Sequence, residues 1–104
     1  MLLIAGILLL FTGCTSHYYI VKGDTVHIYL KRPDAEAVYL SSSLDGYLFH
    51  RAKRVDAKTW EVTLPANGEF TYFYIVDGAV YIPPCMFREY DDFGFGNCIY
   101  IPGL

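Results

Sequence analysis

Residue types that can act in catalysis occur in two short stretches of this chain of 104 residues. Ser41 to Ser43, Asp45 and His50 include the three side chains of a serine nucleophile, its base and an orienting acid. No Gly-x-Ser-x-Gly turn surrounds these serines, so nothing in the sequence positions one of them as a nucleophile. We therefore expect this group to belong to a solvated loop.

The second stretch holds three acidic residues, Glu89, Asp91 and Asp92. Two carboxylates on either side of a glycosidic bond can act as acid and base in its hydrolysis. Adjacent residues of an extended chain point to opposite sides, however, and this separates Asp91 from Asp92. We expect no catalytic residues here and predict that the protein is not an enzyme.

Histidines and cysteines are the remaining residues with chemistry of their own. His17, His27 and His50 lie on separate segments, and Cys85 and Cys98 have no close Cys or His neighbours, so we predict neither a metal site nor a cofactor. An even pair of cysteines in an exported protein can form a disulfide. The alternative is two separate buried thiols, because free cysteine packs like a small hydrophobic residue.

The N-terminal segment predicts where the protein resides. Leu2 to Phe11 is an apolar run of the length of a signal-peptide core, too short to span a bilayer as a helix. It leads through small residues into Cys14, although no Lys or Arg precedes it. This pattern resembles a bacterial lipoprotein signal, which implies a signal peptide over residues 1–13 and a lipidated Cys14. The alternatives are an ordinary cleaved secretory signal or a buried apolar strand.

The residues after Cys14 read as short strands separated by turns. Apolar and polar residues alternate from Lys58 to Leu64, which predicts that Trp60 lies in the core. Further strands are expected over His17 to Val21, Thr25 to Leu30, Glu36 to Ser41, Phe49 to Arg54 and the stretch ending at Val76. Strands at spacings of about ten residues with turns between them are typical of a β-sandwich. We predict a single all-β domain over residues 14–104.

A longer motif points to a family. Tyr72, Tyr74, Val76, Asp77 and Gly78 are followed by Pro83, Gly94 and Asn97, and Val38 to Ser41 supplies an earlier strand. The pattern, from Ala35 to Ile101, resembles the early-set glucan-binding domains: carbohydrate-binding module family 48, the isoamylase N-terminal domain and the glycogen-binding domain of the AMP-activated protein kinase beta subunit. The resemblance implies an immunoglobulin-like (early-set) β-sandwich that binds an α-glucan such as glycogen or starch.

The resemblance also implies site residues. Tyr47 stands where the family has a tryptophan that stacks on a glucose ring, and Phe93 and Asn97 fit the positions that close over the sugar and hydrogen-bond to it. An aromatic ring at position 47 keeps a stacking surface for a sugar. We therefore expect Tyr47, Phe93 and Asn97 to contact the ligand.

Two positions depart from the family. Phe73 replaces a binding lysine, and Val80, with Tyr81 adjacent, replaces a second tryptophan. Phe73 and Tyr81 are expected to extend the stacking platform. For Phe73 the alternative is that other residues of the sandwich cover it. The loss of the lysine and the tryptophan favours an alternative function, in which the same apolar face docks a protein of the cell envelope.

The net charge of the chain indicates which classes of partner to expect. The net charge is −3 and the sequence pI is 5.4, whereas proteins that bind nucleic acid carry a basic patch. The expected partners are an α-glucan or related polysaccharide, or an envelope protein, together with a membrane reached through lipid on Cys14. We expect no binding of nucleic acid, and an exported protein that is lipid-anchored in the bacterial cell envelope.

Overall fold

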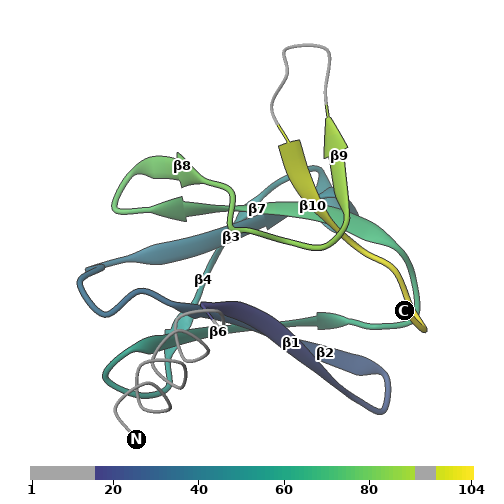
Figure 1. Cartoon of the computed structure of the whole chain (residues 1–104), viewed down its shortest axis with the longest axis horizontal. Coiled ribbons are helices and arrows are strands. Elements are labelled where there is room, and N and C mark those ends of the chain that lie inside the picture. The colour runs from purple at the N-terminus through teal and green to yellow at the C-terminus, as the bar shows by residue number, and fades with distance from the viewer. Residues whose placement is uncertain (1–15, 91–95) are drawn as a thin grey trace, which may run out of the picture.

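Two antiparallel β-sheets pack face to face in the computed structural model, which describes residues 16–90 and 96–104 (Figure 1). One sheet has the strand order β1-β2-β6-β5, and the other has the order β4-β3-β7-β10-β9, with β8 also paired to β7. The strands are β1 (His17–Lys22), β2 (Thr25–Lys31), β3 (Val38–Ser42), β4 (Phe49–Arg51), β5 (Lys53–Arg54), β6 (Thr59–Pro65), β7 (Phe70–Val76), β8 (Ala79–Tyr81), β9 (Arg88–Tyr90) and β10 (Gly96–Tyr100).

This strand order is that of an immunoglobulin-like sandwich. The strands β1-β2-β6-β5 correspond in order to the A-B-E-D sheet of that fold, and β3-β7-β10 to its C-F-G sheet. The predicted all-β, immunoglobulin-like β-sandwich is therefore confirmed. The one helical element among the described residues is a short 3₁₀ turn, η1 (Ser43–Asp45), and no helix in this part of the chain could cross a membrane.

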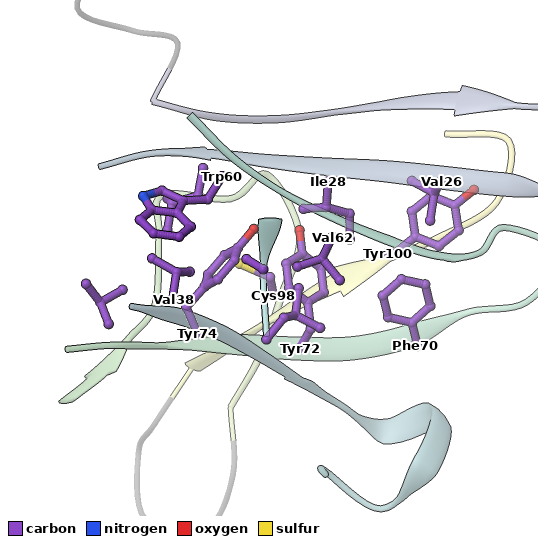
Figure 2. Packing of buried hydrophobic residues seen from close by; sticks show 14 of the residues in the cluster. Val26, Ile28, Val38, Trp60, Val62, Phe70, Tyr72, Tyr74, Cys98 and Tyr100 are labelled. Atoms are coloured by element: carbon purple, nitrogen blue, oxygen red, sulfur yellow. The ribbon is translucent and has the colours of Figure 1, made fainter. Parts of the chain in front are cut away.

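The core lies between the sheets and follows the alternation of the sequence (Figure 2). Val26, Ile28 and Leu30 of β2 are buried, as are Trp60 and Val62 of β6. The prediction that Trp60 is a core residue is thus confirmed, and its indole Nε1 donates a hydrogen bond to the carbonyl of Arg32 at 3.0 Å.

Strand β7 supplies the aromatic half of the core. Phe70, Tyr72, Tyr74 and Val76 alternate along the strand and belong to the core cluster, and Phe70, Tyr72 and Tyr74 point toward the opposite sheet (Figure 2). The intervening residues, Thr71, Phe73 and Ile75, consequently face outward. The strand thus lines the core with one face and places the partly exposed Phe73 on the other.

The expected single edge strand from Phe49 to Arg54 is wrong in its extent. Its first half, β4, pairs with β3, whereas its second half, β5, pairs with β6 in the other sheet. The chain crosses between the sheets at Ala52, which is buried and donates a backbone hydrogen bond to Val38 at 2.8 Å. Ala52 is part of the core cluster, so the crossing itself contributes to the core.

The Asp77-Gly78 turn joins β7 to β8 as a two-residue hairpin. Both residues have positive φ, 48° and 85°, as the tight hairpin turns require. The Asp77 carboxylate also accepts hydrogen bonds from the backbone N–H groups of Glu36 and Ala37, at 2.8 and 2.9 Å. These bonds lower the pKa of Asp77 and tie the turn to the chain that enters β3.

Candidate functional site

The outward-facing side of the six-stranded sheet carries a row of apolar and aromatic side chains. Phe73 and Ile75 of β7 face outward, and the strand register places Tyr39 of β3 opposite Ile75, and Val80 of β8 on its other side. Phe49 of β4 reaches the same side through its pairing with Ser41, which lies opposite Phe73. Paired residues of neighbouring strands share a side. We call this surface the outer face.

Tyr47 lies over the outer face. Its ring stacks on the ring of Phe73, with 5.9 Å between centroids and 22° between planes, and its hydroxyl is hydrogen-bonded to Thr71 Oγ1 at 2.6 Å. The backbone is held as well: Tyr47 N–H donates to Ser42 O at 2.8 Å, and Ser41 Oγ donates to Tyr47 O at 2.7 Å. These contacts keep Tyr47 in the left-handed region at φ 67°, which bulky residues seldom adopt.

The serine-rich segment positions this tyrosine. Ser42 Oγ accepts a hydrogen bond from Leu44 N–H and so caps η1, and Gly46 ends η1 in the left-handed conformation. Ser43 Oγ accepts from the backbone N–H of Thr71, which fixes the turn to β7. The predicted solvated loop is wrong for Ser41 and Ser42, which are buried residues of β3, and holds only for the exposed residues that follow them.

Asp45 and His50, the acid and base types of the same stretch, bind one another on the surface. The hydrogen bond from His50 lowers the pKa of Asp45. The hydroxyl groups of Ser41 and Ser43 are instead hydrogen-bonded to backbone atoms. The observed contacts therefore give these residues a structural role.

Asn97 shares the outer face with Tyr47 and Phe73. It belongs to β10, two residues before Ile99, which pairs with the outward-facing Thr71. Asn97 is therefore on the same side of the sheet as Thr71, and it is partly exposed. Phe93, the other residue expected to contact a sugar, lies outside the described residues.

Tyr81 is on the opposite side of the sheet, so the expected extension of the platform by Tyr81 does not form. It pairs with the inward-facing Tyr74, packs against the core and lies under the guanidinium of Arg32, 4.6 Å from its ring centroid. Val80 faces outward in its place, opposite Ile75. The two-residue turn fixes this register, so counting the alternation across the hairpin would have identified Val80.

Sequence reasoning also missed the residues of the outer face that lie outside β7, on β3, β4 and β8. Phe49 and Val80 are each 61% exposed, large values for apolar residues in strands. The guanidinium of Arg51 lies 5.7 Å from the ring centroid of Tyr39 and also donates a hydrogen bond to its hydroxyl at 3.4 Å. The outer face is thus an aromatic surface with a cation at one end.

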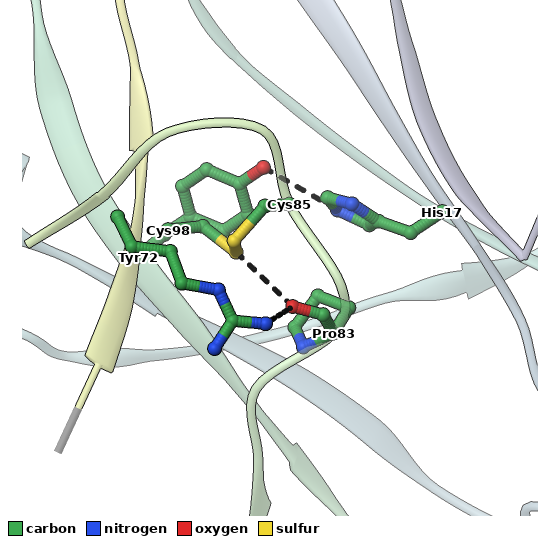
Figure 3. Close-up of a disulfide and its surroundings, with 6 residues drawn as sticks. His17, Tyr72, Pro83, Cys85 and Cys98 are labelled. Atoms are coloured by element: carbon green, nitrogen blue, oxygen red, sulfur yellow. Dashed lines mark hydrogen bonds between the residues drawn. A yellow bond between two sulfur atoms is a disulfide. The ribbon is translucent and has the colours of Figure 1, made fainter.

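Cys85 and Cys98 are joined by a disulfide, with 5.8 Å between their Cα atoms (Figure 3). The carbonyl of Pro83 accepts a hydrogen bond from Arg88 at 3.0 Å and lies 3.8 Å from Cys98 Sγ. The bridge therefore fixes the segment after β8 against β10. Cys14, the expected lipidation site, lies outside the described residues.

Neither known protein families nor curated proteins contain a match to this chain. Among residues 16–90 and 96–104, no three His, Cys, Asp or Glu side chains are grouped so that they could hold a metal ion. What the outer face offers to a ligand is a stacked pair of rings, further apolar side chains and the amide of Asn97.

Proposed function

We propose that the outer face is a non-catalytic binding site for a polysaccharide, with an α-glucan as the leading ligand. The observation that carries the proposal is the conformation of Tyr47. A left-handed backbone costs a residue with a Cβ roughly 1 to 2 kcal/mol. Such strain persists only where surrounding contacts enforce it, and it is concentrated at functional sites. Here the contacts hold one aromatic ring on another at the surface.

A sugar ring would stack on the exposed side of Tyr47. Phe73 supports the other side of that ring, and Tyr47 remains 38% exposed, which leaves part of the residue available to a ligand. Asn97 carries an amide donor and an acceptor on the same side of the sheet, which suits sugar hydroxyl groups. Stacking and hydrogen bonding account for binding without any proton transfer.

A second candidate function is the docking of an envelope protein on the same surface. The exposure of Phe49 and Val80 favours it, because large exposed apolar side chains gathered on one surface are typical of protein interfaces. Phe73 also supplies no hydrogen-bond donor to a sugar.

Titration of the protein with maltooligosaccharides, alongside a pull-down on insoluble glucan, separates the two functions. Saturable binding at millimolar sugar or below supports the glucan site. If the parent protein shows no saturable binding in that range, the protein-docking function replaces it.

We also propose that the protein is exported and held in the cell envelope by lipid on Cys14. The apolar run and the small residues that lead into this cysteine support the proposal. Replacing Cys14 with Ala should abolish lipid-dependent processing and detergent partitioning. A Cys14→Ala protein that is still processed and membrane-bound would exclude lipidation.

A further inference from the structure

A groove runs along β1, the first strand of the described chain. Its volume is about 410 Å³, and it lies between β1 and the segment that follows β8. Its lining residues include Tyr18 and Tyr19 of β1, Met86 and Phe87 of the segment after β8, and Leu104. None of the residues that line the groove is Asp, Glu, Lys or Arg.

The rim of this groove is apolar and open to solvent. Met86 is 88% exposed and Leu104 is 68% exposed, and Tyr18 and Tyr19 are more than one-third exposed. Ile20 and Val21 continue the exposed apolar surface along β1. An apolar surface of this kind on a small domain marks a site of interaction with a protein or a membrane.

The one titratable imidazole in the groove stays neutral. His17 packs against Tyr72 and Tyr74, and its Nε2 is hydrogen-bonded to the Tyr72 hydroxyl at 3.3 Å (Figure 3). Burial lowers the pKa of His17 to about 4 and raises the pKa of Tyr72. Neither group therefore carries charge in this groove near neutral pH.

The short chain between Cys14 and β1 limits how far β1 can lie from a lipid on Cys14. Cys14 and His17 are three residues apart, and an extended chain spans about 3.3 to 3.6 Å per residue, so the two are at most about 11 Å apart. A lipid on Cys14 would hold the start of β1 within that distance of the bilayer surface. Tyrosine is enriched at this level of a membrane, since its ring is apolar and its hydroxyl remains hydrated.

We propose that the β1 groove and its rim form a docking surface for the lipid bilayer, with Tyr18, Tyr19 and Met86 at the level of the headgroups. The proposal rests on the lipidation of Cys14 and is independent of glucan binding. A lipid anchor alone leaves a domain free to rotate, whereas a second contact defines its orientation. Tyr47, Phe73 and Asn97 of the outer face are not among the residues that line the groove.

The test uses the full, lipidated chain in phosphatidylcholine vesicles with or without bromine atoms on the acyl chains, which quench tryptophan at contact range. Met86→Trp and Tyr18→Trp place a probe on the docking surface. Phe49→Trp, at an exposed position of the outer face, is the matched control. The parent protein gives the background from Trp60, which is buried and common to all variants.

Brominated lipid should remove most of the added fluorescence of Met86→Trp and Tyr18→Trp and leave that of Phe49→Trp intact. Equal quenching at the three positions, or none, would overturn the proposal while leaving lipidation standing. Shielding of Met86→Trp from aqueous iodide without quenching by bromine would assign the surface to a protein or a second copy. Protein that does not float with the vesicles lacks the tether, which also overturns the proposal.

Discussion

The ring of Tyr47 rests on the ring of Phe73, with centroids 5.9 Å apart, and its hydroxyl is hydrogen-bonded to Thr71 beside Phe73 on β7. A loop residue is thereby held by a strand through both its ring and its polar end. Since little side-chain freedom remains to be lost when a ligand binds, Tyr47 is preorganised for stacking.

Tyr47→Ala should weaken maltooligosaccharide binding by roughly 1 to 3 kcal/mol, the range found for aromatic stacking on other ring ligands. Tyr47→Phe keeps the ring and loses the bond to Thr71, so it should retain most of the affinity. Calorimetric titration of the parent and both variants measures this difference. Binding that survives Tyr47→Ala unchanged would place the sugar elsewhere on the sandwich.

Asp77→Ala should lower the melting temperature, because it removes the acceptor of the Glu36 and Ala37 N–H groups and places Ala at positive φ. Asp77→Asn is the matched control, since Asn keeps an oxygen acceptor and tolerates the left-handed region. Thermal unfolding followed by circular dichroism should rank the parent and Asp77→Asn above Asp77→Ala. Equal melting of the two variants would mean that the carboxylate bonds contribute nothing.

Tyr74→Phe should stabilise the protein. The Tyr74 hydroxyl is buried and has no hydrogen-bond partner among the described residues, so its desolvation is uncompensated. Removing an unsatisfied hydroxyl while keeping the ring should gain on the order of 1 kcal/mol in the free energy of unfolding. Urea denaturation of the parent and the variant provides the measurement. A less stable variant would indicate a buried water bonded to this hydroxyl.

Reduction of the Cys85–Cys98 disulfide should lower the free energy of unfolding by about 3 kcal/mol, the entropy expected for closing a loop of this length. Urea unfolding with and without reductant measures the change. The double variant Cys85→Ala, Cys98→Ala should match the reduced parent and be insensitive to reductant. A parent whose unfolding does not respond to reductant would show that the bridge contributes no stability.

Acid should destabilise the fold through His17. Its pKa is about 4 in the folded protein and 6.5 in an unfolded chain, so the unfolded state takes up the proton first as the pH falls. The contribution of His17 is complete above pH 6.5 and declines as the pH falls toward 4. His17→Phe, which keeps a ring beside Tyr72 and Tyr74, should flatten the dependence of unfolding free energy on pH in that window. Parallel profiles for the two proteins would contradict the assignment.

The alternation of the sequence was sufficient to predict the sandwich, most of its strands and much of the core. Trp60 and Val62 are inward because polar residues separate them along β6, and the Asp77-Gly78 pair required a tight hairpin. The crossing at Ala52 was not predicted, because a buried alanine between basic residues has no local signature. It arises from the packing of β4 and β5 on two different partners.

The alternation of residues along the strands also made part of the candidate site predictable. Strand periodicity assigns Phe73 to the outer side, and it could have assigned Val80 there in place of Tyr81. The stacking of Tyr47 on Phe73 depends on a left-handed tyrosine, which no sequence pattern specifies. It also depends on hydrogen bonds to Ser41, Ser42 and Thr71, and these exist only once the loop meets β7.

The crossing at Ala52 has a consequence for how the domain opens. Because β4 and β5 are consecutive parts of one segment, the same few residues complete an edge of each sheet. If this segment detaches, β3 and β6 lose a partner together, and the core between them is exposed to water from that side. The segment therefore holds the two sheets together, and neither sheet can lose its edge strand along this border without the other doing so.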